Sequence, residues 1–287
     1  WNILNSMINK NILITCFDRP DSLKKCINHL YLANNINKYN VVFVRQKGNS
    51  KVQKIVENSR FKKKFIINTN YPKKFSPLKK MANNGFKGWK YCFENLKSDY
   101  SIYLEDDILI SYDFLDFHDF IHQKYKNDNK FFGVNGFSSE IFNIKKISKY
   151  SKFVYGLGKG FSTNKQNWQL FRNKIWNKKF LQKINPALDS ANENFVKKNN
   201  FYVVMPICSR ILEDYTNGLH IKKTNKSYFK KIRKSFVKIK YKKKIYEYSF
   251  FERYNWRNDC RKYKGLFIEK LYKFILIIYK KLFTKYY

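Results

Sequence analysis

Three adjacent carboxylates, Glu105, Asp106 and Asp107, are the residues of this sequence best suited to chemistry. They follow the apolar run 101–104, which would place them in a confined cleft, where neighbouring carboxylates repel unless a cation offsets them. Mg²⁺ and Mn²⁺ prefer oxygen ligands and keep waters and substrate phosphates in their shell. The triplet is therefore a candidate metal site. A solvated turn, or a helix start whose dipole suits acidic residues, remains an alternative.

Short apolar runs rich in β-branched residues predict the strands that position this triplet. These runs lie at 11–17, 41–44, 65–68 and 101–104. Apolar residues at helical spacing predict helices at 23–30, 52–56, 79–96 and 114–121. The alternation predicts an α/β fold with a mostly parallel sheet flanked by helices.

Ligands of such sheets bind at the carboxyl ends of the strands. We therefore expect Asp18, Arg19 and Lys47, which follow the first two strands, to share one edge of the sheet with the triplet.

The later part of the chain carries weaker signals. Its pattern predicts a strand at 131–137, a helix at 189–199 and a strand at 202–206. Gly158, in the most glycine-dense stretch, could let the backbone approach a ligand or simply serve a turn. His220 could bind a metal or a diphosphate, or be an ordinary turn residue. Trp168 fits a core position better than a sugar platform.

Composition points to an anionic partner for the C-terminal part. The net charge is +38, and residues 221–287 hold 22 basic and only 4 acidic residues. The segment 265–287 has an apolar run too short to span a bilayer, with flanking lysines and many aromatic residues. It predicts an interfacial helix on an anionic membrane, although a terminal helix packed on its own domain is the alternative.

The five cysteines show no C-x-x-C spacing, which argues against a zinc module and fits a reducing compartment.

Two stretches together resemble a known family. The sequences NILITCFDRPDSLKKCINHL (11–30) and YSIYLEDDILISYDFLDF (100–117) are similar to the GT-A glycosyltransferases, in particular the branch that includes N-acetylglucosaminyltransferase I and its bacterial relatives. Weaker similarity extends over residues 155–168, 187–200 and 206–220. The resemblance implies a GT-A, Rossmann-like catalytic domain over residues 8–220, with residues 221–287 as a basic C-terminal extension.

The resemblance also implies roles for individual residues. Asp107 would bind Mn²⁺ or Mg²⁺, whereas Arg19 would contact the nucleotide, and Glu105 and Asp106 would line the nucleotide-sugar. Asp189, at the start of its helix, resembles the family's general base, with Glu193 and Asp214 as reserves.

A base acting in direct displacement would invert the anomeric configuration. The alternative for Asp189 is that it is simply an N-cap or first-turn acid of its helix. Lys47 stands where the family often has an acidic residue, and it would suit phosphate or an acidic sugar.

These features predict a metal-dependent glycosyltransferase that uses a nucleotide-sugar, with a UDP-sugar as the expected donor. The acceptor would be a glycan or a lipid-linked oligosaccharide of a bacterial surface polymer such as lipopolysaccharide, lipooligosaccharide or capsule. We expect a cytoplasmic protein, peripheral on the inner face of the membrane, that does not bind nucleic acid. A basic nucleic-acid-binding protein, a metal-dependent nuclease or phosphotransferase, and an inactive scaffold of the same fold remain alternatives.

Overall fold

A computed structural model describes residues 8–138, 148–153, 159–183, 186, 188–214 and 247–250. The chain divides into two compact units, Trp1–Phe251 and Glu252–Tyr287, and every described residue belongs to the first. Gly158, His220 and the interfacial helix expected at 265–287 lie outside the described residues. The domain boundary near residue 220 stays a prediction, because residues 215–246 are also outside them.

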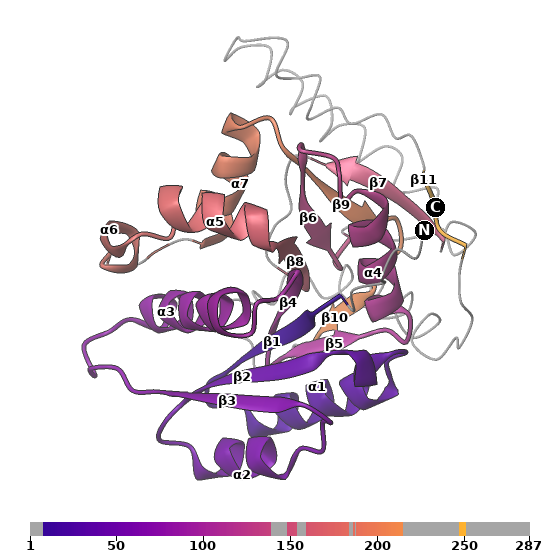
Figure 1. Ribbon diagram of the computed structural model, residues 1–287. Helices are drawn as coiled ribbons and strands as arrows, with labels where there is room; N and C mark the ends of the chain where they lie inside the picture. Colours follow the sequence, from indigo (N-terminus) through magenta and orange to yellow (C-terminus); the bar gives the residue numbers. More distant parts are fainter. Residues whose placement is uncertain are drawn as a thin grey trace, which may run out of the picture. The chain divides into compact units, whose positions relative to one another are not determined.

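Among the described residues, the main sheet has nine strands in the order β11-β7-β9-β6-β8-β4-β1-β2-β3 (Figure 1). Four parallel strands form one side of it: β1 (Lys10–Cys16), β2 (Asn40–Gln46), β3 (Lys64–Thr69) and β4 (Tyr100–Glu105). β1 lies between β2 and β4, so Ile12 stands opposite both Val41 and Ile102. These strands match the predicted apolar runs, and the predicted α/β class with a mostly parallel sheet is confirmed.

The other side of the sheet is mixed. It contains β6 (Phe131–Asn135), β7 (Lys149–Phe153), β8 (Phe161–Asn164), β9 (Tyr202–Pro206) and β11 (Ser249–Phe250). β8 runs antiparallel to both β4 and β6, and β7 runs antiparallel to β9. A separate antiparallel ribbon pairs β5 (Ile108–Ile110) with β10 (Ile211–Glu213).

Helices cover both faces of the sheet (Figure 1). One face packs against α1 (Pro20–Leu32), α2 (Ser50–Asn58) and α4 (Phe114–Lys124). The other packs against α3 (Pro77–Lys90), α5 (Lys165–Lys174), α6 (Lys178–Leu181) and α7 (Leu188–Lys198). A π-helical turn, Tyr91–Asn95, continues α3, so the helix predicted at 79–96 is present with a change of pitch.

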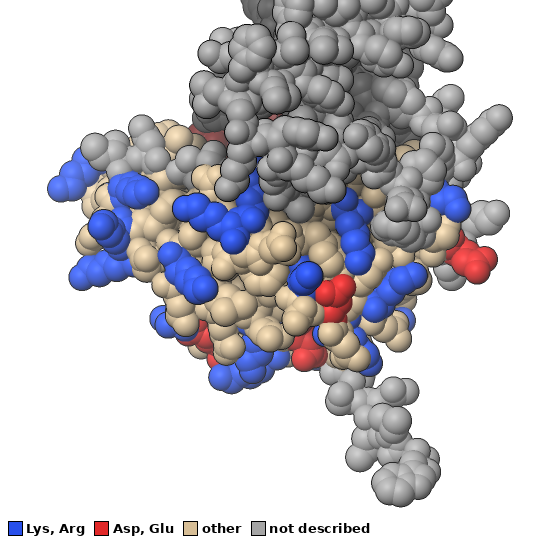
Figure 2. Space-filling model, turned by 90° about the horizontal axis from the view of Figure 1, so that it is seen from above, with Lys and Arg blue, Asp and Glu red and all other residues tan. Residues whose placement is uncertain are grey.

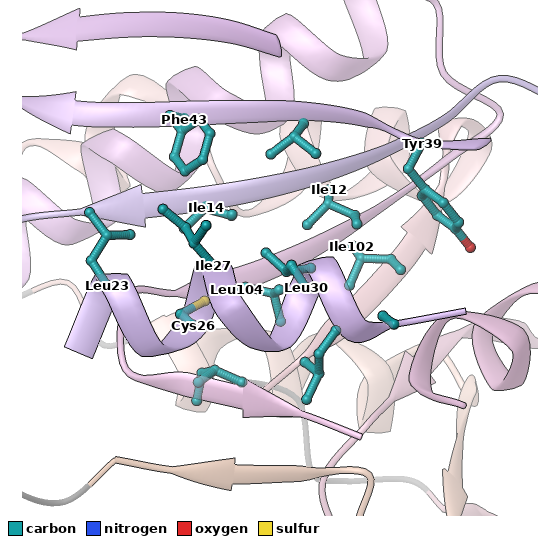
Figure 3. Packing of buried hydrophobic residues seen from close by; sticks show 14 of the residues in the cluster. Ile12, Ile14, Leu23, Cys26, Ile27, Leu30, Tyr39, Phe43, Ile102 and Leu104 are labelled. Atoms are coloured by element: carbon teal, nitrogen blue, oxygen red, sulfur yellow. The ribbon is translucent and has the colours of Figure 1, made fainter. Parts of the chain in front are cut away.

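The helix that follows β1 shows why the sequence folds in this way. Pro20 fits the first turn of α1, where a backbone N–H would lack a partner in any case. Leu23, Cys26, Ile27 and Leu30 recur at helical spacing and face the strands that carry Ile12, Ile14, Phe43, Ile102 and Leu104 (Figure 3). All of these side chains are buried, and each large apolar one contributes about 1.5–3 kcal/mol by leaving water. This packing holds the start of α1 at the end of β1.

Two expectations about single segments can be compared with the structure. Trp168 is buried on α5, where its ring stacks on Trp89 and Phe93, so its interpretation as a core residue is confirmed. Within the ranges given above, none of the helices has the length and apolar character needed to cross a membrane.

Candidate functional site

The turn after β1 and the acidic triplet lie side by side at the carboxyl ends of two neighbouring strands. Thr15 of β1 stands opposite Glu105, the last residue of β4. Phe17, Asp18 and Arg19 then form the turn into α1, and Asp106 and Asp107 form the turn into β5. The parallel register therefore brings the two turns together.

Arg19 joins the two turns through its guanidinium group. Nη1 donates a hydrogen bond to Oδ2 of Asp107, and Nη2 donates to Oδ1 of Asp106. The backbone N–H of Phe17 donates to the second Asp106 oxygen at 3.0 Å. Both oxygens of Asp106 are thus engaged, so this carboxylate serves to fix the turn.

Burial sets the electrostatics of this cluster. Asp106 is 1% exposed, and burial raises its pKa to about 6, although Arg19 and the Phe17 N–H favour the charged form. Burial alone would lower the pKa of Arg19, but Asp106, Asp107 and Glu105 outweigh it and raise that pKa. The guanidinium therefore stays charged and partly offsets the negative charge of the triplet.

Asp107 differs from Asp106 in having one oxygen without a partner. Its Oδ1 atom is buried and accepts no hydrogen bond from any residue within the described ranges. A buried carboxylate oxygen of this kind is a suitable ligand for a hard cation. No group of three or more His, Cys, Asp or Glu side chains is arranged to hold a metal within those ranges. Mg²⁺ is commonly bound by one or two carboxylates together with substrate phosphates, so Asp107 fits such a cation.

The remaining predicted donor-site residues occupy the same edge of the sheet. Asp18 is exposed in the turn before α1. Lys47 is exposed directly after β2, and its backbone N–H donates to the carbonyl of Thr69 at 2.9 Å. Glu105 is half-buried at the end of β4. Of the predicted donor-site residues, Arg19, Asp106 and Asp107 are the ones that the hydrogen bonds described above join directly.

The predicted general bases lie on other elements. Asp189 is in the first turn of α7, and the structure describes its backbone alone. Glu193 is also on α7, and its Oε2 lies 3.7 Å from Nζ of Lys197 one turn later. Asp214 follows β10, and its Oδ2 accepts hydrogen bonds from Ser22 Oγ at 3.1 Å and Lys25 Nζ at 2.9 Å. Asp214 and Glu193 are thus both ion-paired, and their use as reserve bases stays a prediction.

Sequence reasoning missed several contributors to this cluster. The Phe17 N–H donates from the backbone, so no side-chain pattern reveals it. Ser22 and Lys25 have the i, i+3 spacing that places two side chains on one helix face, which was the available signal. Their partner Asp214 lies 192 residues from Ser22 and 189 from Lys25, and only the tertiary fold brings it there.

The described surface is rich in positive charge. Figure 2 shows Lys and Arg side chains spread over one face, with a few Asp and Glu side chains among them. Asp106, with 1% exposure, makes little contribution to this surface. Glu105 and Asp107 are partly exposed, so the triplet still adds negative charge at one place on this basic surface.

Comparisons with known proteins give likeness in structure only. No protein-family model matches the chain, and no curated protein matches it. A mannosyltransferase from Pyrobaculum calidifontis, PcManGT, solved in complex with GDP-Man and Mn²⁺, is similar with a TM-score of 0.51 and 10% sequence identity. The match covers 74% of this chain and 58% of the mannosyltransferase chain.

Two further solved structures have lower TM-scores. TarS from S. aureus has a TM-score of 0.47 at 10% identity, and the match covers 69% of this chain and 35% of the TarS chain. A cytidylyltransferase from Leptospira borgpetersenii has a TM-score of 0.46 at 11% identity, with 84% and 100% covered. This chain thus spans less than two thirds of the TarS and mannosyltransferase chains. The likeness to the mannosyltransferase agrees with the sheet and helices described above, and the chain has an α/β, Rossmann-like fold of the GT-A kind.

Proposed function

We propose that this chain is a metal-dependent glycosyltransferase that moves a sugar from a nucleotide-sugar to a hydroxyl group of a glycan or glycolipid acceptor. The observation that carries the proposal is the buried Oδ1 atom of Asp107, which has no hydrogen-bond partner within the described ranges. It lies at the carboxyl edge of the sheet, where ligands of α/β proteins bind. The similar fold of a mannosyltransferase solved with GDP-Man and Mn²⁺ supports the same reaction class.

Asp107 would hold Mn²⁺ or Mg²⁺ through Oδ1. When bound, such a cation would neutralise the diphosphate leaving group as a Lewis acid. Arg19 already touches Oδ2 of Asp107, so it can stay charged beside the cation site and contact a phosphate oxygen of the donor. Asp106 would keep Arg19 and the backbone of Phe17 in place rather than bind the cation itself.

Lys47, Asp18 and Glu105 would complete the donor site. The exposed ammonium of Lys47 suits a phosphate or an acidic sugar, and a UDP-sugar is the donor that we propose. Gly158 and His220 are further proposed donor-site residues, and both lie outside the described residues.

Proton transfer would fall to a carboxylate on α7. The acceptor hydroxyl must lose its proton as the new bond forms, and a positioned carboxylate can accept it. We propose Asp189 for this role, with inversion at the anomeric carbon. Glu193 is the reserve, since its pairing with Lys197 at 3.7 Å is partly exposed and weak.

The biological setting that we propose is synthesis of a bacterial surface glycan on the inner face of the cytoplasmic membrane. The support is the charge of the C-terminal segment, because residues 221–287 include 22 basic and 4 acidic residues. Such a segment would attract anionic lipid close to a lipid-linked acceptor.

A screen of nucleotide-sugars tests the proposed activity. UDP-, GDP- and CMP-sugars would be assayed for Mn²⁺-dependent binding and hydrolysis, with wild type, Asp107→Ala and Asp21→Ala compared. Asp21 is an exposed acid in the first turn of α1 and serves as the matched control. We expect the Mn²⁺-dependent part of binding to disappear in Asp107→Ala alone. Absence of binding in wild type, or equal turnover in Asp107→Ala, would contradict the proposal.

A further inference from the structure

The ribbon of β5 and β10 continues directly from the acidic triplet. β5 begins at Ile108, immediately after Asp107, and Ile108 pairs with Glu213 of β10. One residue further, the backbone N–H of Asp214 donates to the carbonyl oxygen of Asp107 at 2.7 Å. The main chain of the candidate metal ligand is thus held by Asp214, the residue directly after β10.

The side chain of Asp214 connects this ribbon to α1. Its Oδ2 accepts from Ser22 Oγ at 3.1 Å and from Lys25 Nζ at 2.9 Å, and its side chain is 9% exposed. α1 begins directly after Arg19, whose guanidinium binds Asp107. The contacts therefore close a ring that runs from Arg19 to Asp107, to Asp214, and back through α1.

The opposite end of β10 is fixed separately. Arg210 donates through Nε to Asp113 at 2.8 Å, and its carbonyl accepts from the N–H of Ser111 at 2.8 Å. Both ends of the ribbon are consequently anchored, one in the core and one on α1. Loss of the side-chain contacts of Asp214 with Ser22 and Lys25 would loosen the end that adjoins Asp107, which the ion pair of Glu213 with Lys159 also holds, and would leave the end at Arg210 in place.

We propose that Asp214 is a positioning residue that fixes Asp107 for cation binding, through its backbone N–H and its ion pair with Lys25. The inference rests on the proposed function, because it assumes that Asp107 binds the cation. Partners that orient a metal ligand typically change metal affinity 10- to 100-fold when they are removed. Asp214 would act in this way on Asp107 without touching the substrate.

Mn²⁺ binding to the full chain tests this inference without a turnover assay. Free Mn²⁺ would be followed by electron paramagnetic resonance during titration, with and without UDP. The variants are Asp214→Asn, Lys25→Met and their double mutant, and Lys24→Met is the matched control. Lys24 is exposed on the same helix and has no hydrogen bond or ion pair within the described ranges, and Lys25 is 47% exposed, so both methionine variants should fold.

We expect Asp214→Asn and Lys25→Met each to weaken Mn²⁺ binding about 10-fold in the folded fraction. The double mutant should be no weaker than the weaker single variant, because both changes remove the same Lys25–Asp214 ion pair. Lys24→Met should bind like wild type. If wild type binds Mn²⁺ and both single variants bind it equally well, the positioning role is wrong while the proposed function stands. If wild type binds no Mn²⁺ with or without UDP, both are wrong.

Discussion

Arg210 and Asp113 form an ion pair that is almost fully excluded from solvent. Nε of Arg210 lies 2.8 Å from Oδ2 of Asp113, and the two side chains are 0% and 1% exposed. Asp113 also accepts from Ser111 Oγ at 2.8 Å and from Tyr248 Oη at 2.9 Å. The carboxylate is thus satisfied by three segments that are far apart in the sequence.

Removal of Arg210 should strongly destabilise the fold. Arg210→Met leaves the Asp113 charge buried without its cation, which typically costs about 3–5 kcal/mol. Urea denaturation followed by circular dichroism measures the change. The matched control is Arg172→Met, because the pair of Arg172 with Glu94 spans 2.5 Å and is 41% and 31% exposed. Exposed pairs contribute about 0–1 kcal/mol, so equal losses in the two variants would refute the structural role of Arg210.

The strands β1, β2 and β4 could be predicted because they are buried and therefore consist of apolar runs. Ile12, Leu13 and Ile14 of β1 are all fully buried, and strands with both faces covered read as continuous apolar runs. The mixed half lacks this signal. β8 consists of Phe161 to Asn164, and its buried Ser162 and Thr163 are stabilised by hydrogen bonds to His118, His122 and the Phe132 carbonyl rather than by their own propensity.

The candidate site could also be predicted only in part from the sequence. The carboxyl-end rule places Arg19 beside Asp106 and Asp107, since it needs only the strand ends. It says nothing about Asp214, because β10 has three residues and a pattern that short does not identify a strand. Its position depends on the pairing of β10 with β5, a segment that lies far away in the sequence.

Two buried histidines should make stability fall in acid. His118 Nδ1 and His122 Nε2 each lie 2.7 Å from Ser162 Oγ, and burial lowers both pKa values, that of His122 to about 3. Tyr100 stacks on the His122 ring at 4.1 Å. Both imidazoles are therefore neutral in the fold, whereas the unfolded chain binds protons below about pH 6.5. Stability is fully present above that pH and is lost as pH falls.

Urea denaturation between pH 7 and pH 5 measures this effect. Each histidine that gains a proton only on unfolding contributes a slope of about 1.4 kcal/mol per pH unit below its unfolded pKa. His122→Phe keeps the stacking on Tyr100 and removes one such proton, so its pH slope should be smaller by about that amount. An unchanged slope would show that His122 already titrates normally in the fold.

Arg19 should stabilise the turn whether or not a cation binds. Arg19→Met removes the guanidinium from Asp106, which is 1% exposed, and from Asp107 beside it. We expect a loss of roughly 2–4 kcal/mol in the free energy of unfolding, since a buried carboxylate is left without its cation. Arg60→Met, at an exposed position, is the control and should change it by less than about 0.5 kcal/mol. A loss in Arg19→Met no larger than the control's would mean that solvent reaches Asp106.

Gly133 on β6 should not tolerate even one additional carbon atom. A Cβ there would lie 2.1 Å from the carbonyl oxygen of Ser162 and 2.7 Å from the ring of Phe161, both on the neighbouring strand β8. A backbone carbonyl cannot turn away as a flexible side chain could, so Gly133→Ala must push the two strands apart. The β6–β9 register also shifts between Phe131 and Gly133, so Gly133 lies at an irregularity of the sheet.

Gly133→Ala should therefore lower the free energy of unfolding by about 1–3 kcal/mol or more. The comparison is Gly48→Ala after β2, where φ is +117° and no atom lies within 4 Å of an added Cβ. That change tests backbone strain alone, which costs of order 1 kcal/mol. Urea denaturation of both variants separates overlap from strain. A smaller loss in Gly133→Ala than in Gly48→Ala would contradict the close approach of β6 and β8, because overlap with a fixed carbonyl cannot cost less than a local change of φ.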